Sequence, residues 1–271
     1  MIIDFHTHIY PDKIAPRAIE NVLKNNEFKT PPTDGTFNGL IESEKEAGID
    51  ISVVLPVATR AGQFDSLNAF AKQVNSQTDK IISFAGIYPD DENIEQKLDF
   101  IKSQGFKGIK LHPDYQNTFV DDDKYFRIVS YAVEIGLIVV FHAGIDNGLP
   151  FVVHCPADRA ARLIDRVYGG KTPDKISIVL AHMAGINEPD SLRKYIIGKP
   201  VFLDTAYILD KADPSLIVSL AREHGTDKML FGSDSPWVSQ KKFVRTFDSL
   251  PFTAEEKQAI LCNNAKALLG I

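Results

Sequence analysis

Residues 81–113, IISFAGIYPDDENIEQKLDFIKSQGFKGIKLHP, read as a strand, a helix and a second strand. The runs at 81–88 and 106–112 are apolar on both faces, which is typical of parallel strands covered by helices. The segment between them, residues 93–105, has apolar positions at helical spacing and ends in the glycine expected after a helix. The order therefore indicates a parallel βαβ unit.

The same alternation continues towards both ends of the chain. We expect strands at residues 2–8, 50–57, 81–88, 106–112, 137–143, 176–182, 201–207 and 228–234. We expect amphipathic helices at residues 93–105, 123–136, 156–170 and 214–225. No linker, low-complexity tract or break in composition divides the chain, so residues 1–271 are expected to form one domain. Eight β–α units favour an α/β fold of the (β/α)8 TIM-barrel type over a doubly wound sheet.

Composition narrows the classes of function. The chain is 44% hydrophobic and 24% charged with a net charge of −6, so it has no basic footprint for nucleic acid and small molecules are the favoured substrates. No apolar run approaches the ~20 residues of a membrane span, and no secretory leader is recognisable. Cys155 and Cys262 lack C-x-x-C spacing and are interpreted as packing residues of a cytoplasmic protein. A homo-oligomer remains possible.

Histidines gather at one end of the expected strands. His6 and His8 end the first strand, His112 the fourth, His142 the fifth and His182 the sixth, and Asp234 ends the eighth. Active sites of such barrels form at the C-terminal ends of the strands, so the set indicates a catalytic centre. Taken alone, His6 and His8 would equally fit two solvated histidines. Alternation along residues 2–8 predicts that Asp4, His6 and His8 share one face, with Ile3 and Phe5 on the other.

The motifs around these residues resemble those of the amidohydrolase superfamily, in the branch often called amidohydrolase 2. They are DFHTH at 4–8, GIKLHP at 108–113, VVFHAG at 139–144, VLAHMAG at 179–185 and LFGSDSP at 230–236. This branch contains small-molecule hydrolases, lactonases and decarboxylases. The resemblance implies a metal ion bound by His6, His8, His142 and Asp234, with His182 near the reacting oxygen.

The residue types fit this chemistry. Imidazoles with one carboxylate suit Zn²⁺, although Mn²⁺, Fe²⁺, Co²⁺ or Ni²⁺ accept the same ligands. Such an ion lowers the pKa of its water from ~15.7 towards ~7, and Asp234 can take the water's proton and pass it to the leaving group. His182 can polarise the carbonyl or stabilise the oxyanion. His112 is expected to face the substrate, and Arg60, after the second strand, can grip a substrate carboxylate or can equally be a solvated loop arginine.

Lys110 raises the question of a second metal ion. Alternation places it on the inward face, one layer deeper than His112. In dinuclear members of the superfamily a carboxylated lysine on the fourth strand bridges two ions, in which case Lys110 and His182 would be second-metal ligands. An unmodified Lys110 must lie deeper, pair with an acid such as Asp4, or lose its charge. We favour the unmodified, mononuclear state.

The leading function is metal-dependent hydrolysis of an ester, lactone or amide of a small, carboxylated compound. The alternative is a non-oxidative decarboxylase of a carboxylated aromatic or related acid, which would use the same metal site. A phosphodiesterase of the deoxyribonuclease-like branch is disfavoured, because its bridging carboxylate is missing from the fourth strand. A barrel that keeps its metal without turnover is the non-enzymatic alternative. His224, at the end of an expected helix, is interpreted as a histidine stabilised by the helix dipole.

Overall fold

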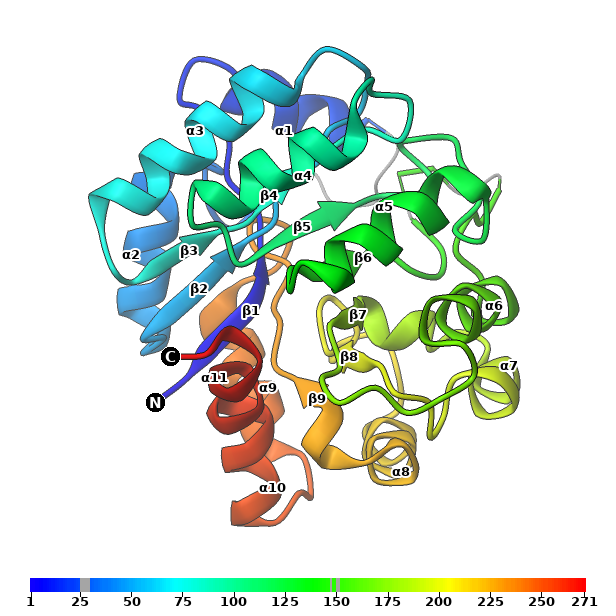
Figure 1. The fold of residues 1–271 in the computed structure, drawn as a ribbon. Coiled ribbons are helices and arrows are strands. Elements are labelled where there is room, and N and C mark those ends of the chain that lie inside the picture. Colours follow the sequence, from blue (N-terminus) through cyan, green and yellow to red (C-terminus); the bar gives the residue numbers. More distant parts are fainter. Residues whose placement is uncertain (25–29, 147, 150–151) are drawn as a thin grey trace.

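The computed structural model describes residues 1–24, 30–146, 148–149 and 152–271, and Figure 1 shows strands surrounded by helices. The strands are β1 Ile3–Thr7, β2 Ile51–Val54, β3 Ile81–Ser83, β4 Ala85–Gly86, β5 Gly108–Leu111, β6 Ile138–Phe141, β7 Ile178–Leu180, β8 Phe202–Asp204 and β9 Met229–Leu230. The helices are α1 Ala15–Leu23, α2 Phe37–Ala47, α3 Phe64–Gln77, α4 Ile94–Ser103, α5 Asp123–Glu134, α6 Ala157–Tyr168, α7 Pro189–Tyr195, α8 Pro214–His224, α9 Gln240–Ser249, α10 Ala254–Gln258 and α11 Asn264–Leu269. All eight expected strands and all four expected helices are confirmed, the third strand being divided into β3 and β4 at Phe84.

The strands form a closed parallel barrel. The order is β1-β2-β3 in one run and β4 to β9 in the other, with every pair parallel. Closure comes from backbone hydrogen bonds between β1 and the segment that follows β9. Phe5 N–H donates to Phe231 O at 2.8 Å, and Asp234 N–H donates to His6 O at 2.8 Å. The predicted (β/α)8 barrel is confirmed, and neighbouring strands in Figure 1 run in the same direction.

The apolar residues divide into an inner and an outer layer. The inner layer fills the barrel and comes from strands around its circumference, including Phe5, Phe84, Val140 and Leu230. Residues of α11 join this cluster, so the C-terminal helix covers one end of the barrel beside the start of β1 (Figure 1). The outer layer packs the opposite faces of the strands against the surrounding helices. Burial of both strand faces explains why the strands read as continuously apolar.

The expected assignment of faces within β1 is wrong. Ile3 and Phe5 belong to the inner layer, whereas Asp4 Oδ2 accepts a hydrogen bond of 2.7 Å from Gln240 Nε2 on α9, outside the barrel. The pairing of β1 with β2 shifts register between positions 4 and 7. An irregularity of this kind reverses the side to which later side chains point, so His6 reaches the interior although Asp4 does not.

Capping residues mark where helices begin and end. Thr36 caps α2 by accepting from Gly39 N–H, and α6 ends at Gly169, whose φ of 60° is in the left-handed region.

Cys155 and Cys262 are buried and free, as expected of packing residues. Within the described ranges, no helix is both long and apolar enough to cross a membrane.

His224 ends α8 as expected, but its predicted dipole-stabilised charge is wrong. Its ring is buried, its Nε2–H donates to Val201 O at 2.8 Å, and its Nδ1 accepts from Gly198 N–H at 3.3 Å. Burial lowers the pKa of His224 from 6.5 to about 4. The neutral ring therefore joins the end of α8 to the segment that leads into β8.

Candidate metal centre

Three side chains from the first and last strands form a compact group, called here the first triad. His6 Nε2 lies 3.1 Å from His8 Nε2 and 3.5 Å from Asp234 Oδ1, and His8 Nε2 lies 3.2 Å from the same oxygen. Ligands bonded at ~2.0–2.2 Å to a tetrahedral ion lie ~3.3–3.6 Å apart. The three atoms therefore have the spacing of ligands that share one divalent ion.

Each imidazole of the first triad is fixed by a hydrogen bond from Nδ1, the ring nitrogen that does not face the triad. His6 Nδ1–H donates to Asp204 Oδ2 at 2.8 Å, and His8 Nδ1–H donates to Leu55 O at 2.9 Å. A neutral imidazole carries one N–H, so each Nε2 lone pair is left facing the other ligands. Asp204, at the end of β8, was not recognised from the sequence, where a buried acid in VFLDTAY was the available signal.

The protonation states also suit a cation. Burial lowers the pKa of His6 well below its ordinary value, and the charge of Lys110 adds to this effect. Burial alone would raise the pKa of Asp234, but its interactions with the neighbouring His8 and His6 outweigh it, and the pKa falls below its ordinary value. The neutral imidazole of His6 therefore faces an ionised carboxylate, which is the state in which these groups bind metal.

The backbone is strained at two of the predicted catalytic residues. Asp234 has φ 77° and His182 has φ 56°, both in the left-handed region that side-chain-bearing residues rarely adopt. Such conformations cost of order 1–3 kcal/mol and persist where the surrounding structure enforces them, often at functional sites. Here the closure bonds of the barrel hold Asp234, and Asp204 Oδ1 holds the backbone of His182 with a bond of 2.8 Å.

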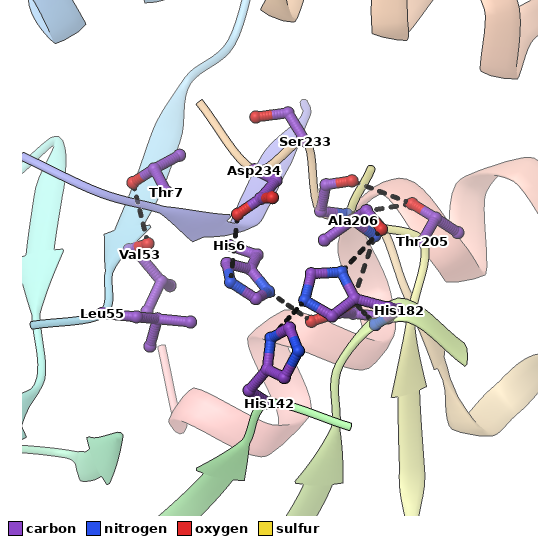
Figure 2. A network of polar contacts seen from close by, with 12 residues as sticks. His6, Thr7, Val53, Leu55, His142, His182, Thr205, Ala206, Ser233 and Asp234 are labelled. Carbon is purple, nitrogen blue, oxygen red and sulfur yellow. Dashed lines mark hydrogen bonds and ion pairs between the residues drawn. The ribbon is translucent and has the colours of Figure 1, made fainter. Parts of the chain in front are cut away.

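His182 lies between the first triad and His142. Its Nδ1–H donates to Ala206 O at 2.9 Å, which leaves its Nε2 lone pair 3.0 Å from His142 Nδ1. The centroid of its ring is 5.2 Å from that of His6. Figure 2 shows the three rings of His6, His142 and His182 converging below Asp234. His182 is therefore next to the first triad without a bond to it.

His142, the fourth predicted ligand, lies in an adjacent group. Among the described residues it clusters with His112 and Asp146, with one ligand atom of each within 4.8 Å of the others. Its ring stacks on that of His112 at a centroid distance of 4.1 Å. The structure thus brings together three of the four predicted ligands, and coordination by His142 stays a prediction.

Lys110 is fully buried at the site, as its inward position predicted. Its Nζ lies 3.5 Å from His6 Nε2. Burial lowers the pKa of Lys110 to about 8, while the charges of Asp204 and Asp234 oppose the decrease. Asp4, considered as its partner, faces α9 instead. The unmodified state of Lys110 stays a prediction.

The loops that follow the strands hold Arg60 and further acidic residues. Arg60 is exposed on the loop between β2 and α3, where its backbone N–H donates to Gln63 Oε1 at 3.1 Å, and its role in substrate binding stays a prediction. His154 donates to Asp114, which follows β5. Asp114 and Asp146 were not predicted from the sequence, and neither was Asp204. No motif distinguishes an acid after a strand from an ordinary loop residue.

Comparison with known proteins agrees with this geometry. The amidohydrolase family model matches residues 3–271. The chain belongs to the amidohydrolase family. The resemblance inferred from the strand-end motifs is thereby confirmed over almost the whole length of this family member. A search of curated protein sequences found no match.

Solved structures similar to this amidohydrolase family member include decarboxylases and a hydrolase. A 2,6-dihydroxybenzoate decarboxylase from Rhizobium has a TM-score of 0.72 at 14% identity, covering 99% of this chain and 98% of that chain. A Pseudomonas putida protein provisionally named 2-pyrone-4,6-dicarboxylic acid hydrolase has a TM-score of 0.70 at 18% identity, covering 99% and 97%. A 5-carboxyvanillate decarboxylase from Novosphingobium aromaticivorans, solved with bound manganese, has a TM-score of 0.70 at 15% identity, covering 100% and 97%. The TM-scores show that the fold is shared.

Proposed function

We propose that the chain is a metal-dependent hydrolase that attacks an ester, lactone or amide of a small, carboxylated compound. The observation that carries the proposal is the first triad, in which His6 Nε2, His8 Nε2 and Asp234 Oδ1 lie 3.1–3.5 Å apart. Zn²⁺ is the ion we expect, and Mn²⁺, Fe²⁺, Co²⁺ and Ni²⁺ accept the same donors. We propose that His142 is the fourth ligand, and an ion with these four protein ligands still accepts a water when it is five-coordinate.

Asp234 is proposed as the proton acceptor. A divalent ion bound there lowers the pKa of a coordinated water from ~15.7 towards ~7. The lowered pKa of Asp234 keeps its carboxylate ionised at neutral pH. Asp234 can therefore remove a proton from the attacking water and return it to the leaving group, so that one carboxylate moves one proton in each turnover.

His182 is proposed to stabilise the developing oxyanion. Its Nδ1–H donates to Ala206 O, so Nε2 is the ring atom that can face a substrate oxygen. A proton taken from solvent before the substrate binds would let Nε2 donate a hydrogen bond where negative charge develops. The bond from the backbone N–H of His182 to Asp204 keeps the residue in place.

Substrate carboxylates have candidate cationic partners. Lys110 lies beside His6, and its pKa of about 8 leaves it charged at neutral pH before a metal ion binds. Arg60 is exposed on the loop after β2, near which a carboxylate would enter. His112 lies between Lys110 and the loops above the barrel. We propose that Arg60 and His112 contact the substrate and that an unmodified Lys110 supplies charge from below.

Decarboxylation is the second candidate, because the fold is shared with decarboxylases at 14% and 15% identity. That reaction needs a proton donor for the carbon that loses carbon dioxide. Hydrolysis is placed first because Asp234 is ionised at neutral pH and can accept a proton from an attacking water. Incubation with lactones, esters, amides and carboxylated aromatics separates the candidates, since hydrolysis releases an alcohol or amine and decarboxylation releases carbon dioxide.

The proposed role of Asp234 is tested by Asp234→Asn, which keeps the size of the side chain and removes its basicity. We expect turnover to fall by about 10²- to 10⁴-fold in protein reloaded with metal, measured with a hydrolysed substrate from the screen. Asp121→Asn, a carboxylate paired with Arg159 and Arg162, is the matched control and should leave turnover unchanged. Near-native turnover in metal-loaded Asp234→Asn would contradict the proton-transfer role.

A further inference from the structure

Asp4 is a carboxylate on the outer face of β1, and it is not one of the proposed ligands. Its exposed fraction is 0%. Oδ1 accepts from Ser233 N–H at 2.8 Å and from His6 N–H at 3.2 Å. Oδ2 accepts from the hydroxyl of Ser233 at 2.5 Å and from Gln240 Nε2–H on α9 at 2.7 Å. These four donors replace the water that the carboxylate loses on burial.

Ser233 connects Asp4 to both sides of Asp234. It precedes Asp234 in the chain, and its Oγ accepts from Ser235 N–H at 3.0 Å while its hydroxyl proton is donated to Asp4. Its carbonyl oxygen accepts from Tyr207 N–H at 3.1 Å. Figure 2 shows Ser233 on the far side of Asp234 from the histidine rings. The bonds of Ser233 therefore fix the backbone before and after Asp234 from the side away from the ligand atoms.

The backbone of Asp234 depends on such support. Its φ of 77° is in the left-handed region, and a residue with a side chain keeps this conformation only where its surroundings enforce it. A change in this angle would move Oδ1, which lies 3.2 Å from His8 Nε2 and 3.5 Å from His6 Nε2. Loss of the bonds to Ser233 should therefore alter the spacing of the first triad.

The same carboxylate also holds the backbone of β1. The pairing of β1 with β2 shifts register between Asp4 and Thr7, and within this stretch Asp4 Oδ1 accepts from His6 N–H. His6 is thus bonded to Asp4 directly, and Asp234 is bonded to it through Ser233. One buried carboxylate therefore joins two of the three members of the first triad.

We propose that Asp4 is a positioning residue for the first ion and that it acts through Ser233 and His6. Both of its oxygens are occupied outside the barrel, so Asp4 contacts neither the ion nor the substrate. Gln240 holds Oδ2 from α9, and the helix after the last strand thereby supports the metal centre. The inference rests on the proposed function in one respect, since it takes the first triad as ligands of one ion.

Ser233→Ala is the sharpest test, because it removes the hydroxyl that bonds Asp4 and Ser235 and leaves every proposed ligand in place. Chelator-treated protein is titrated with Zn²⁺ by isothermal titration calorimetry, after circular dichroism has shown that the variant is folded. Partners that orient metal ligands contribute about 10- to 100-fold to affinity. We expect the affinity to fall by about 10-fold or more in both Ser233→Ala and Asp4→Ala.

Asp4→Asn should restore part of this affinity. Its amide oxygen can still accept from the backbone N–H groups of Ser233 and His6. Its NH₂ group then takes the place of Oδ2, and Gln240 can turn its amide to accept from it, since Gln240 Oε1 has no partner among the described residues. Partial rescue by Asp4→Asn would show that the bonds to the backbone, and not burial alone, determine the affinity.

Asn68→Ala is the matched control for a purely structural effect. Asn68 is equally buried on α3, and its amide exchanges two hydrogen bonds of 2.9 Å with the backbone of Gly86 on β4 instead of with the first triad. This variant should lower the free energy of unfolding, measured with urea, and keep the affinity for Zn²⁺.

Two results would contradict the account, and they differ. Wild-type affinity in Ser233→Ala and Asp4→Ala, with the free energy of unfolding lowered as in Asn68→Ala, would overturn the positioning role and leave the proposed function standing. A wild-type protein that binds no Zn²⁺ would overturn the proposed function itself. If Asp4→Ala does not fold, Ser233→Ala alone decides the question.

Discussion

Asp204 is the residue that joins the first triad to His182. One of its oxygens accepts from His6 Nδ1–H at 2.8 Å, and the other accepts from the backbone N–H groups of His182 at 2.8 Å and Ala206 at 3.0 Å. Burial raises the pKa of Asp204, and the charges of His182 and Lys110 oppose this increase. A single buried carboxylate therefore fixes the tautomer of one proposed ligand and the backbone of the proposed oxyanion donor.

Substitution of Asp204 should weaken the binding of the first ion. Asp204→Asn keeps the shape but removes the charge that favours His6 Nδ1–H, and we expect metal affinity to fall by about 10- to 100-fold. Isothermal titration with Zn²⁺ or Mn²⁺ measures the change. Asp99→Asn, which alters an exposed carboxylate bonded to Tyr131, should have no effect. Equal affinities for the two variants would contradict the positioning role.

The site residues that could be predicted from the sequence are histidines or acids at the end of an expected strand. His6, His8 and Asp234 have both signals, and the structure brings their ligand atoms together. Asp204 could not be predicted, because its partner His6 lies 198 positions away and their pairing depends on the closed barrel. The stacking of His142 on His112 was likewise not predictable, since strand position does not specify how a ring is oriented.

At the scale of elements, two loops that follow site-bearing strands approach each other closely. Gly144, after β6, has φ 80°, and a Cβ built on it would lie 2.5 Å from Gly185 Cα after β7. The absence of a side chain at both positions permits this contact. The same two loops leave the strands that carry His142 and His182, so their approach supports the 3.0 Å bond between those rings.

Gly144→Ala should therefore be more costly than a substitution that only strains the backbone. Gly169→Ala is the matched control, because Gly169 has φ 60° and no atom lies within 4 Å of a built Cβ. We expect the control to lower the free energy of unfolding by about 1–2 kcal/mol and Gly144→Ala to lower it by a further ~1–3 kcal/mol. Urea unfolding followed by circular dichroism measures both, and equal losses would show that the close approach is unimportant.

The contact between α8 and the segment before β8 should give a pH-dependent stability. Burial lowers the pKa of His224 from 6.5 to about 4, so between these values the unfolded chain binds a proton that the folded protein does not. The free energy of unfolding should therefore decrease as the pH falls from 6.5 towards 4, by up to about 3 kcal/mol. Urea unfolding at several pH values compares wild type with His224→Gln, in which this contribution should be missing. Parallel pH profiles would contradict the assignment.

The positions of strands and helices were predicted more fully than the register in which the strands pair. Apolar runs and terminal glycines located all eight strands and four helices, because burial on both faces and left-handed helix ends leave direct marks in the sequence. The register shift in β1 left no such mark, and simple alternation placed Asp4 on the wrong face. The shift follows from pairing with β2 and from the polar partners of Asp4 outside the barrel, which only the assembled fold brings together.

At the scale of the whole molecule, barrel closure and the candidate metal centre depend on the same contacts. Asp234 N–H donates to His6 O at 2.8 Å, and His8 N–H donates to Ser235 O at 2.6 Å. The first and last strands therefore meet at the residues that supply the first triad. The alternation of strands and helices predicted the barrel. The packing of α11 over one end of it could not be predicted, because the extent of the inner apolar layer is known only from the fold.

The central claim is that the first triad holds one divalent ion in the closed barrel, and anomalous diffraction tests it most directly. Crystals of protein loaded with Zn²⁺ or Mn²⁺ are measured on both sides of the absorption edge of the metal. The account predicts an anomalous peak at ~2.0–2.2 Å from His6 Nε2, His8 Nε2 and an oxygen of Asp234. An ion bound elsewhere, with no peak among these three atoms at saturating metal, would contradict it.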